Sequence, residues 1–482
     1  MQAQKEFHVT VTGSPQGNGS MAQPWDLQSA LSQQPDVING GDIVWVHEGV
    51  YDGRFVSTLK STVKDKNVTV APYHDQKVVL NGNVSSDRPS VLEVRGNNVT
   101  FKLLEITFVG DFPRHMADAN FKKVDGVNHL SGEDCAFIAL KIHNNPGSGF
   151  GSWKLTGGTL ISGCQIFNNG YFSKVRGSGA GMYVQNSSDK VRLIKDNLIF
   201  NNYYIGVEVW SATTRATAAY VQNISLKNNV IFNNGLPGGH HKNNLLVATA
   251  DRNGTNRASN IIVDSNILYH NTDIANNKSS GDAGSLQLGV KGGAPLKNIS
   301  VINNVIIGGN NALRLNTAED IAFDNNIVYG GYVHLYKAII GNMSTWNFTD
   351  NCYYSKNIRN FRVIDYKDYT FKEWQQAFNI DGSSQWKNIK AFSLRPVLNI
   401  IQSELKPSEF YVSLFDKEGK HVTVDFSDYS IPEHTKYTIQ DIASEAILSE
   451  GFLLSTGQVI FEMGTENDTY NNFGVYKIVF EK

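Results

Sequence analysis

The sequence of 482 residues has little cysteine and little charge, and it contains no long apolar run. Its three cysteines, Cys135, Cys164 and Cys352, are too few and too scattered for a disulfide framework or a zinc site. The formal net charge is only −2, and charged residues make up 18% of the chain. This balance argues against nucleic acid or an anionic membrane surface as the main partner. No apolar run approaches the roughly 18 residues of a membrane-spanning helix, so no span is predicted.

Motifs of several enzyme classes are also missing. No glycine-rich phosphate loop leads from a strand into a helix, and neither an HExxH nor a GxSxG motif occurs. These absences argue against nucleotide-dependent enzymes, zinc proteases and serine esterases. There is also no tight aspartate cluster of the kind that holds calcium. We therefore predict neither a metal nor a cofactor.

What the chain does contain is a short phrase repeated seven times between residues 163 and 356. The copies are GCQIFNN (163–169), DNLIFNN (196–202), NNVIFNN (228–234), SNILYHN (265–271), NNVIIGG (303–309), NNIVYGG (325–331) and DNCYYSK (350–356). Apolar residues alternate within each copy, which indicates strands, and a repeat of this length indicates a stack of similar units. One coil of a parallel β-helix fits this pattern. The Asn or Asp that usually opens each copy is predicted to form a corner, because Asn tolerates a left-handed backbone.

The sequence divides into three parts. Residues 1–355 are predicted to form the parallel β-helix, with a short helix at 25–33 over its open end. Residues 356–400 form a connecting segment that contains a helix at 369–384. Residues 401–482 alternate in strands and turns, which predicts a small antiparallel β domain. This domain is expected either to pack on the end of the β-helix or to bind sugar.

A second set of strands lies between the repeated phrases, at 181–186, 206–211, 244–249, 285–290, 312–317 and 332–337. Their apolar residues must face the core, because a shift of one residue would invert every side chain. The register of 244–249 is ambiguous, since its centre is apolar throughout. The outward residues of the other strands are Tyr183, Gln185, Glu208, Trp210, Gln287, Gly289, Arg314, Asn316, His334 and Tyr336. This mixture of rings, amides and charges suits sugars better than it suits a solvated face, which is the alternative.

Glu208 is the main candidate for catalysis, because it is the carboxylate on the central part of this strip. Beside Trp210 and Tyr183 it should lose solvent, which raises a carboxyl pKa and suits a general acid. The alternative is a structural glutamate bonded to a neighbouring coil. The predicted catalytic residues are Glu208, Asp251, His334 and Arg314. The predicted substrate-binding residues are Tyr183, Gln185, Trp210, His241, Lys242, Arg252, Asp282, Gln287, Lys291, Asn316 and Tyr336.

Three functions remain open at this point. A glycoside hydrolase, which we favour, needs a second carboxyl group, and Asp251 and Asp282 are the nearest in sequence. A uronate lyase needs a base and a cation beside the developing enolate, which Tyr183, His334, Lys291 and Arg314 could supply. A non-catalytic glycan-binding protein is the third possibility.

Several stretches resemble a known superfamily. They are TGSPQGNGSMAQPWDLQSAL (12–31), GGDIVWVHEGVYDGRFVSTL (40–59), GSGAGMYVQN (177–186), NNALRLNT (310–317), YTFKEWQQAFNIDGSS (369–384) and the terminal β domain. They look like bacterial right-handed parallel β-helix proteins of the pectin-lyase-like superfamily. The resemblance implies a carbohydrate-active protein like the secreted polysaccharide lyases and glycosidases. Where relatives carry a His, this chain has Ala180, so the chemistry of that position is not carried over.

The first residues, MQAQKEF, lack the apolar and basic regions of a signal peptide. Either the protein is cytoplasmic, or a signal peptide was removed and a start Met added. We favour the second on the resemblance, which implies a secreted, periplasmic or cell-surface protein. The expected partner is a polysaccharide or oligosaccharide substrate, and the expected state is a monomer.

Overall fold

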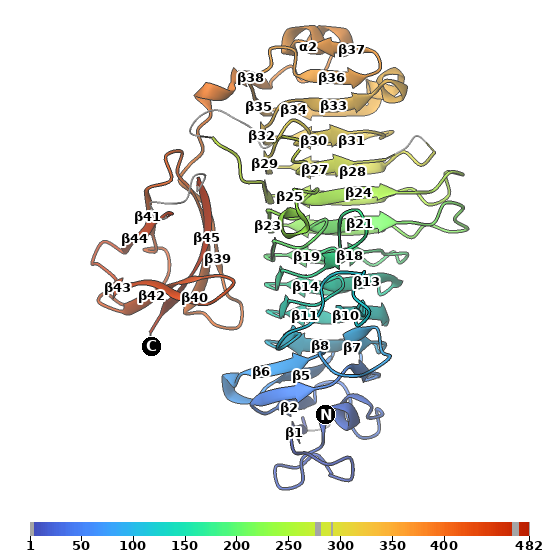
Figure 1. The fold of residues 1–482 in the computed structure, drawn as a ribbon, viewed down its shortest axis with the longest axis vertical. Coiled ribbons are helices and arrows are strands. Elements are labelled where there is room, and N and C mark those ends of the chain that lie inside the picture. The colour runs from blue at the N-terminus through green and yellow to red at the C-terminus, as the bar shows by residue number, and fades with distance from the viewer. Residues whose placement is uncertain (1–3, 275–280, 291–292, 465–471, 482) are drawn as a thin grey trace.

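The computed structural model describes residues 4–274, 281–290, 293–464 and 472–481. It confirms the predicted fold class, an all-β right-handed parallel β-helix with a small antiparallel β domain (Figure 1). Three twelve-stranded sheets run the length of the solenoid, and each coil contributes one strand to each sheet. No helix among the described residues is long and apolar enough to cross a membrane.

Sheet 1 contains β1 (Glu6–Val9), β2 (Ile43–Val46), β5 (Val68–Pro72), β8 (Val99–Lys102), β11 (Ala136–Ile138), β14 (Leu160–Ser162), β19 (Arg192–Lys195), β22 (Gln222–Lys227), β25 (Ser259–Asp264), β28 (Lys297–Ile302), β31 (Ile321–Asp324) and β34 (Trp346–Thr349). Sheet 2 contains β4 (Phe55–Ser57), β7 (Ser90–Val94), β10 (Asp125–Ser131), β13 (Phe150–Leu155), β18 (Met182–Val184), β21 (Val207–Ser211), β24 (Leu245–Thr249), β27 (Leu286–Leu288), β30 (Leu313–Leu315), β33 (Val333–Tyr336), β36 (Phe361–Ile364) and β37 (Lys367–Tyr369).

Sheet 3 contains β3 (Gly49–Asp52), β6 (Val78–Asn81), β9 (Glu105–Thr107), β12 (Lys141–His143), β15 (Gln165–Phe167), β20 (Leu198–Phe200), β23 (Val230–Phe232), β26 (Ile267–Tyr269), β29 (Val305–Ile307), β32 (Ile327–Tyr329), β35 (Cys352–Ser355) and β38 (Gln385–Asn388). The short 3₁₀ segments are Tyr73–Asp75, Leu236–Gly238, Lys337–Thr345 and Ile389–Ala391. A small hairpin, β16 (Tyr171–Phe172) with β17 (Gly177–Ser178), projects from the coils near sheet 2.

The repeated phrase holds two polar positions with different roles. The first is the corner, where Asn228, Asn303 and Asn325 have φ of 54°, 59° and 50°, as the left-handed prediction requires. The second is an inward, buried Asn, which occupies the second position of six copies and the last position of the first three. Asn145 and Asn244, outside the phrase, are buried in the same way. These inward amides form two ladders, Asn197–Asn229–Asn266–Asn304–Asn326–Asn351 and Asn145–Asn169–Asn202–Asn234–Asn244, with Nδ2 to Oδ1 distances of 2.9 to 3.1 Å. The sequence analysis identified the corners but not the ladders.

Both ends of the solenoid are closed by apolar residues. Helix α1 (Leu27–Leu31) lies inside the predicted range 25–33, and Asp26 accepts a hydrogen bond from the amide of Ser29 at its start. At the other end, helix α2 (Phe371–Phe378) begins with a capping box of Thr370 and Glu373. Its fully buried Trp374 stacks on Phe361 with ring centroids 4.7 Å apart.

The solenoid extends beyond residue 355, where the sequence analysis placed its end. Strand β36 pairs in parallel with β33, and β38 pairs in parallel with β35. The repeated phrase does stop, but the coil needs only strands with inward apolar residues. In the last coils Phe361, Trp374 and Tyr353 supply the apolar volume that Ile and Leu supply elsewhere.

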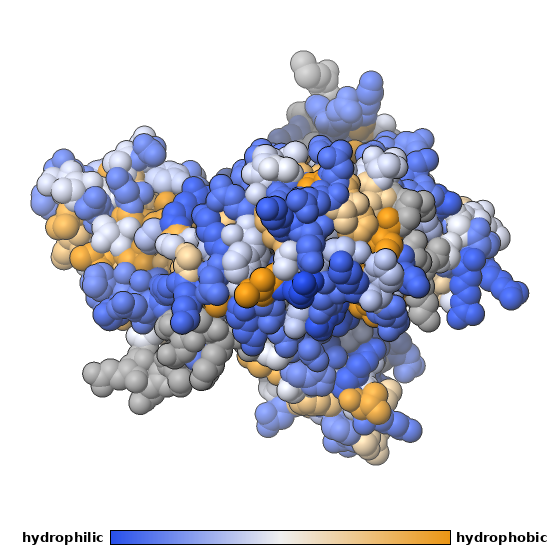
Figure 2. Space-filling model, turned by 90° about the horizontal axis from the view of Figure 1, so that it is seen from above, coloured by the Kyte–Doolittle hydropathy of each residue, from blue (hydrophilic) through white to orange (hydrophobic). Residues whose placement is uncertain are grey.

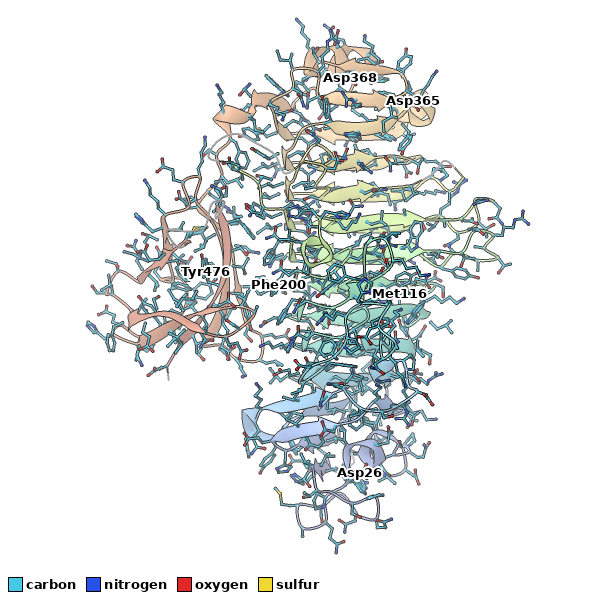
Figure 3. The ribbon with its side chains drawn as sticks, in the orientation of Figure 1. Asp26, Met116, Phe200, Asp365, Asp368 and Tyr476 are labelled. Atoms are coloured by element: carbon cyan, nitrogen blue, oxygen red, sulfur yellow. The ribbon has the colours of Figure 1, made fainter. Side chains whose placement is uncertain are left out.

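The C-terminal domain has a five-stranded antiparallel sheet, β39 (Val397–Gln402), β40 (Glu409–Phe415), β45 (Phe473–Phe480), β42 (Lys436–Asp441) and β43 (Ile447–Phe452). Strands β41 (His421–Asp425) and β44 (Gln458–Glu462) pair separately. The domain packs along the side of the solenoid, against sheet 3, rather than on its end (Figures 1 and 3).

The surface that this domain covers is a column of outward aromatic residues. Phe167, Phe200 and Phe232 stack on successive strands with ring centroids 4.8 and 4.9 Å apart. From the domain, Phe473 lies against Phe232 and stacks on Tyr269 at 4.2 Å. In Figure 3, Phe200 lies at the border that faces the domain containing Tyr476. The contact buries a continuous apolar cluster, so the domain is a fixed part of the molecule.

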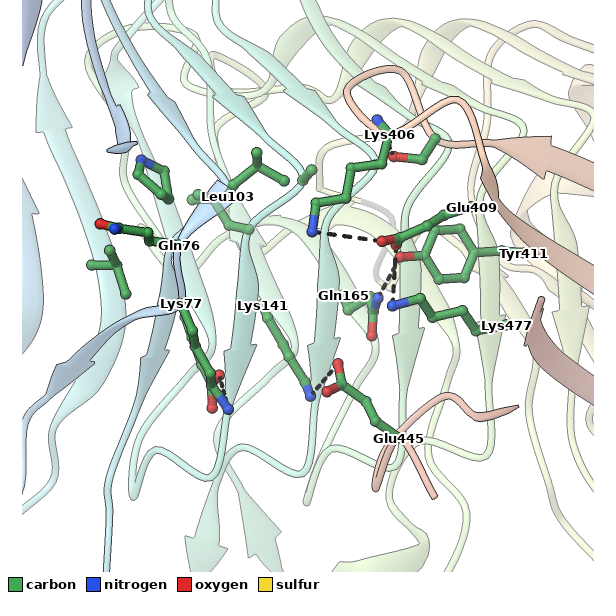
Figure 4. A pocket seen from close by; sticks show the side chains of 17 residues that line it. Gln76, Lys77, Leu103, Lys141, Gln165, Lys406, Glu409, Tyr411, Glu445 and Lys477 are labelled. Atoms are coloured by element: carbon green, nitrogen blue, oxygen red, sulfur yellow. Dashed lines mark hydrogen bonds and ion pairs between the residues drawn. The ribbon is translucent and has the colours of Figure 1, made fainter. Parts of the chain in front are cut away.

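Charged residues surround a small cavity of about 250 Å³ at the edge of this contact (Figure 4). Lys141 pairs with Glu445 at 3.0 Å, and Lys477 pairs with Glu409 at 3.1 Å. Seen from the end of the solenoid, the surface is mostly hydrophilic, with apolar patches on the C-terminal domain at the left (Figure 2).

Candidate functional site

Sheet 2 presents its outward residues in the register that the alternation predicts. Tyr183 lies beside Glu208, Glu208 beside Leu246, and Leu246 beside Gln287. The column then continues through Arg314, His334 and Arg362. The inward residues Met182, Val184, Val207 and Val209 are fully buried.

The structure resolves the ambiguous strand β24. Leu245 and Val247 face the core, so Leu246 and Ala248 face outward. Both outward residues are nevertheless buried, because Ile205, Tyr204, Trp210 and Val290 cover them. The partly buried Tyr204, Trp210 and Val290 therefore form an apolar patch next to Glu208, which is the kind of surface that packs against a sugar ring.

Glu208 lies in a groove of about 690 Å³ on this face. Its lining residues include Lys123, Asp125, Trp153, Tyr171, Arg176, Ala180, Tyr183, Tyr204, Glu208, Trp210, Asn243, Leu246, Gln287 and Val290. The sequence analysis missed Lys123, Asp125, Trp153, Arg176 and Tyr204. They come from a loop, from the starts of neighbouring strands and from the β16–β17 hairpin, and no repeat pattern marks them.

The Glu208 carboxylate makes no hydrogen bond and no ion pair with any other described residue. Burial raises the pKa of Glu208 to about 7, although the charges of Arg176 and Lys123 act to lower it. Burial also raises the pKa of Tyr183 and of Tyr204, and the charge of Glu208 adds to both shifts. The groove thus holds a carboxyl group that exchanges its proton near neutral pH, beside two phenols that keep theirs.

Two exposed cations line the groove near Glu208. The Arg176 guanidinium lies over the ring of Tyr204, 3.9 Å from its centroid. Lys123 Nζ lies 3.7 Å from Asp125 Oδ1. Burial lowers the pKa of Lys242, and the charge of Arg176 contributes to that shift. The charge of Lys123 neutralises that of Asp125. Arg176 has no acidic partner among the described residues, so its positive charge faces the groove.

Asp125 is a second carboxyl group in the same groove. It accepts hydrogen bonds from the amide of Ser148 at 2.7 Å and from Asn128 Nδ2 at 3.3 Å. Burial raises its pKa, while the charge of Lys123 opposes the rise. Asp125 starts strand β10, and Glu208 is on β21, three strand spacings away, or about 14 Å across the sheet at roughly 4.7–4.9 Å per spacing. The residue of β10 in register with Glu208 is Asn128, three residues after Asp125, so the backbones of Asp125 and Glu208 lie farther apart than this.

Aromatic rings form the floor of the groove. The rings of Trp153 and Tyr183 lie 5.1 Å apart, and Trp153 Nε1 donates to Asn128 Oδ1 at 3.1 Å. The buried Gln185 donates from Nε2 to Tyr183 Oη at 3.2 Å and to the Trp210 carbonyl at 3.1 Å. Gln185 therefore orients the rings, and its own amide has little surface left for a ligand.

Several predicted site residues lie outside the groove. Both Asp251 oxygens accept backbone hydrogen bonds, from Ala216 at 3.1 Å and from Asn256 at 2.9 Å, so this carboxylate holds its own loop. Asn316 is buried and donates to the Gly289 carbonyl at 2.9 Å. Asp282 is exposed and accepts from Asn311 at 3.1 Å. Each of these three side chains is therefore held by hydrogen bonds to its own loop or to a neighbouring coil.

The remaining predicted residues are spread along the same face. Arg314 lies three strand spacings from Glu208 in the column, followed by His334, and Tyr336 is exposed. Burial lowers the pKa of His334 to about 4, with Arg314 and Arg362 adding to the shift, so its imidazole is neutral near pH 7.

The loop residues among the predictions do not line the groove either. His241 lies against His270, with ring centroids 4.5 Å apart, and Arg252 is exposed. Lys291 lies outside the described residues. Among the residues that are described, no group of three or more His, Cys, Asp or Glu is arranged to hold a metal ion.

No protein-family model matches the chain, and no curated protein sequence matches it. Among solved structures it is similar to the complex of XylC with xylose, with a TM-score of 0.50 at 12% identity over 98% of this chain and 100% of that chain. It is also similar to pectate lyase Pel9A, with a TM-score of 0.48 at 14% identity over 83% of this chain and 84% of that chain. A rhamnogalacturonan lyase has a TM-score of 0.46 at 13% identity over 83% of this chain and 92% of that chain. At such identities the likeness shows the fold alone.

Proposed function

We propose that the protein is a carbohydrate-processing enzyme and that Glu208 is its proton-transferring residue. The observation that carries the proposal is the Glu208 carboxyl group itself. It makes no hydrogen bond or ion pair with another described residue, burial raises its pKa to about 7, and it lies in a groove with aromatic rings on its floor. A group with this pKa suits general acid–base catalysis at neutral pH. The similar fold of XylC in complex with xylose supports a sugar as the ligand.

The reaction that the groove supports best is β-elimination on a uronate-containing glycan. The ionised Glu208 would take the proton next to the uronate carboxylate, and that electron pair would form the C4–C5 double bond as the C4–O bond breaks. Tyr183, whose raised pKa keeps its hydroxyl protonated, would donate a proton to the leaving oxygen. Arg176 and Lys123 would neutralise the charge on the substrate carboxylate. Solvent would then return a proton to Tyr183 and take one from Glu208.

Hydrolysis, which the sequence analysis favoured, is the second candidate, and Asp125 is the observation that supports it. Hydrolases place their two carboxyl groups about 5–5.5 Å or about 6.5–9.5 Å apart. Asp251 and Asp282 do not line the groove, and the backbone of Asp125 lies more than about 14 Å from that of Glu208. Both side chains would have to lean toward each other to act on one bond. Elimination needs no second carboxyl group, so we favour elimination over hydrolysis as the reaction of this groove.

The test is turnover of uronate-containing and neutral glycans by the wild type and by Glu208→Gln. The substitution keeps the shape of the side chain but removes its exchangeable proton, so turnover should fall by about 10²–10⁴-fold. Glu48→Gln, which changes an exposed carboxylate outside the groove, is the matched control and should keep full turnover. Near-normal activity of Glu208→Gln would remove this residue from catalysis.

The product and the pH profile separate the two reactions. Elimination gives an unsaturated sugar that absorbs in the ultraviolet, and it needs ionised Glu208, so activity should rise as the pH passes about 7. Hydrolysis gives a reducing end without ultraviolet absorption. If Glu208 is then the general acid, activity should fall above the same pH.

A further inference from the structure

Arg192 is buried in the interior of the solenoid and has no acidic partner among the described residues. Arg192, on strand β19, has no exposed surface, and burial lowers its pKa to about 9 with no carboxylate contributing. On the neighbouring strand β22 of sheet 1, the residue in register with Arg192 is Ile224. A guanidinium thus occupies an inward position that a neighbouring strand fills with isoleucine. Burying an unpaired charge is strongly unfavourable, so this cation needs a partner.

Only one edge of the guanidinium is satisfied by the protein. Arg192 Nη2 donates to the Trp153 carbonyl at 3.3 Å and to the carbonyl and hydroxyl oxygens of Thr156. The other two nitrogens, Nε and Nη1, are buried and have no hydrogen-bond partner among the described residues. The unmet donors therefore lie on the side of the guanidinium away from the turn at Thr156.

Two further polar side chains are buried in the same part of the interior. His129 on β10 and Ser152 on β13 are partners in register, both face inward, and neither has exposed surface. The Ser152 hydroxyl has no hydrogen-bond partner, and the ring nitrogens of His129 make no well-formed hydrogen bond. Ser152 directly precedes Trp153, whose carbonyl accepts a hydrogen bond from Arg192, so the guanidinium reaches this part of strand β13. Burial lowers the pKa of His129 to about 3, and the charge of Arg192 contributes, so the imidazole is neutral.

We propose that Arg192, His129 and Ser152 form an interior site for one small inorganic anion, of which chloride is the natural example. The site offers guanidinium N–H groups, a hydroxyl and an imidazole, all of which can donate, and no ionised acceptor. One negative charge balances the guanidinium. All three side chains are fully buried, so a ligand between them would be enclosed by protein, and a carboxylate that belongs to a substrate in the groove is excluded.

The site lies directly behind the groove. The Trp153 carbonyl accepts from Arg192, while the Trp153 ring lines the groove next to Tyr183. An anion that holds the guanidinium in place therefore also holds the strand that carries Trp153. This consequence concerns the groove, but the proposal itself does not depend on which reaction the groove performs.

The first experiment measures unfolding of the full chain in chloride or bromide, with gluconate added to keep the ionic strength constant. An anion that binds one site in the folded state lowers the unfolding equilibrium constant about tenfold for each tenfold rise in its concentration above the Kd. Arg192→Met should abolish this dependence. Ser152→Ala, which keeps the guanidinium, should shift the dependence to higher halide concentrations.

Lys227→Met is the matched control, because Lys227 is a surface cation whose side chain is 59% exposed. It should keep the wild-type halide dependence, which separates a bound ion from general salt screening. If Arg192→Met does not fold, the halide titration of Ser152→Ala tests the proposal instead, by whether the halide dependence of its stability shifts to higher concentrations. A crystal grown in bromide should show an anomalous peak at Arg192. Stability that does not respond to halide, or density for water alone at Arg192, would overturn the proposal.

Discussion

At the scale of single residues, Glu208 shows how the groove keeps a reactive acid. The side chain points outward from β21 as the alternation requires, but rings and loops around it remove water. Because no protein donor compensates for the lost hydration, its pKa rises to about 7. The same burial makes the ionised form costly, so Glu208 should lower the stability of the folded protein at neutral pH.

Glu208→Gln should therefore stabilise the protein while it lowers turnover. The folded-state pKa is raised from 4.5 to about 7, so below about pH 4.5 the proton is bound in both states and the cost vanishes. As the pH rises toward 7, the unfolded chain releases this proton while the folded protein retains it, and the wild type loses stability. At about pH 8 the variant should be more stable by about 1–3 kcal/mol, allowing for the partial exposure of the side chain.

Chemical denaturation of both proteins at about pH 4 and about pH 8 measures this difference. The two unfolding free energies should agree at the lower pH and separate at the higher one. An equal difference at both pH values would show that the carboxyl group is not buried as described.

At the scale of elements, the coils depend on side chains as much as on backbone pairing. The side chain of Asn229 is typical of the ladders: its Nδ2 donates to Asn266 Oδ1 in the next coil and to the Ile194 carbonyl in the previous coil, and its Oδ1 accepts from the backbone amide of Asn197 in the previous coil. These bonds satisfy backbone groups at corners where strand pairing ends. The outward Asn beside it instead adopts the left-handed corner conformation. Two adjacent residues of one type thus have separate structural roles.

Asn229→Ala should destabilise the protein by about 2–4 kcal/mol, because it leaves buried partners such as the Ile194 carbonyl and the Asn197 amide without hydrogen bonds. Asn228→Gly is the matched control at the adjacent position. Glycine adopts φ of 54° without strain, so its cost should stay within about 1 kcal/mol. Urea denaturation compares the two, and equal losses would contradict the distinction between ladder and corner.

At the scale of the whole molecule, the C-terminal domain covers the outward aromatic column of sheet 3. Phe167, Phe200 and Phe232 would otherwise form an exposed apolar stripe along the solenoid, which soluble proteins rarely leave uncovered. The domain contacts sheet 3, whereas the groove lies on sheet 2. Its structural role therefore does not require it to touch the ligand.

Phe473→Ala should weaken this contact by about 3 kcal/mol, because Phe473 packs against Phe232 and Tyr269 and leaves a cavity when truncated. Phe452→Ala is the control, since that ring is 62% exposed and should change stability by less than about 0.5 kcal/mol. Calorimetry of both variants measures the effect. Equal melting curves for the two would show that the domain does not rely on this contact.

Much of the fold follows from local periodicity, which a single sequence displays. The alternation of apolar residues determined which side chains face the core, and therefore placed Tyr183, Glu208, Gln287, Arg314 and His334 in one outward column. The repeated phrase determined the coil and its corners. The facing of side chains and the positions of the corners can both be predicted from short stretches of sequence, because a strand and a turn are each specified within a few residues.

Tertiary structure decided what lies around that column. The groove is completed by residues from a loop, a strand start, a hairpin and a corner, which are Lys123, Asp125, Arg176 and Tyr204 respectively. Their positions in the sequence relative to Glu208 do not indicate that they share a site with it. The loop residue Asp251, near Glu208 along the coil, instead bonds its own backbone. The sequence by itself determined which residues face outward, because pleating is a local property. Only the folded chain decided which of them lose water and meet, because burial depends on segments that the fold brings together.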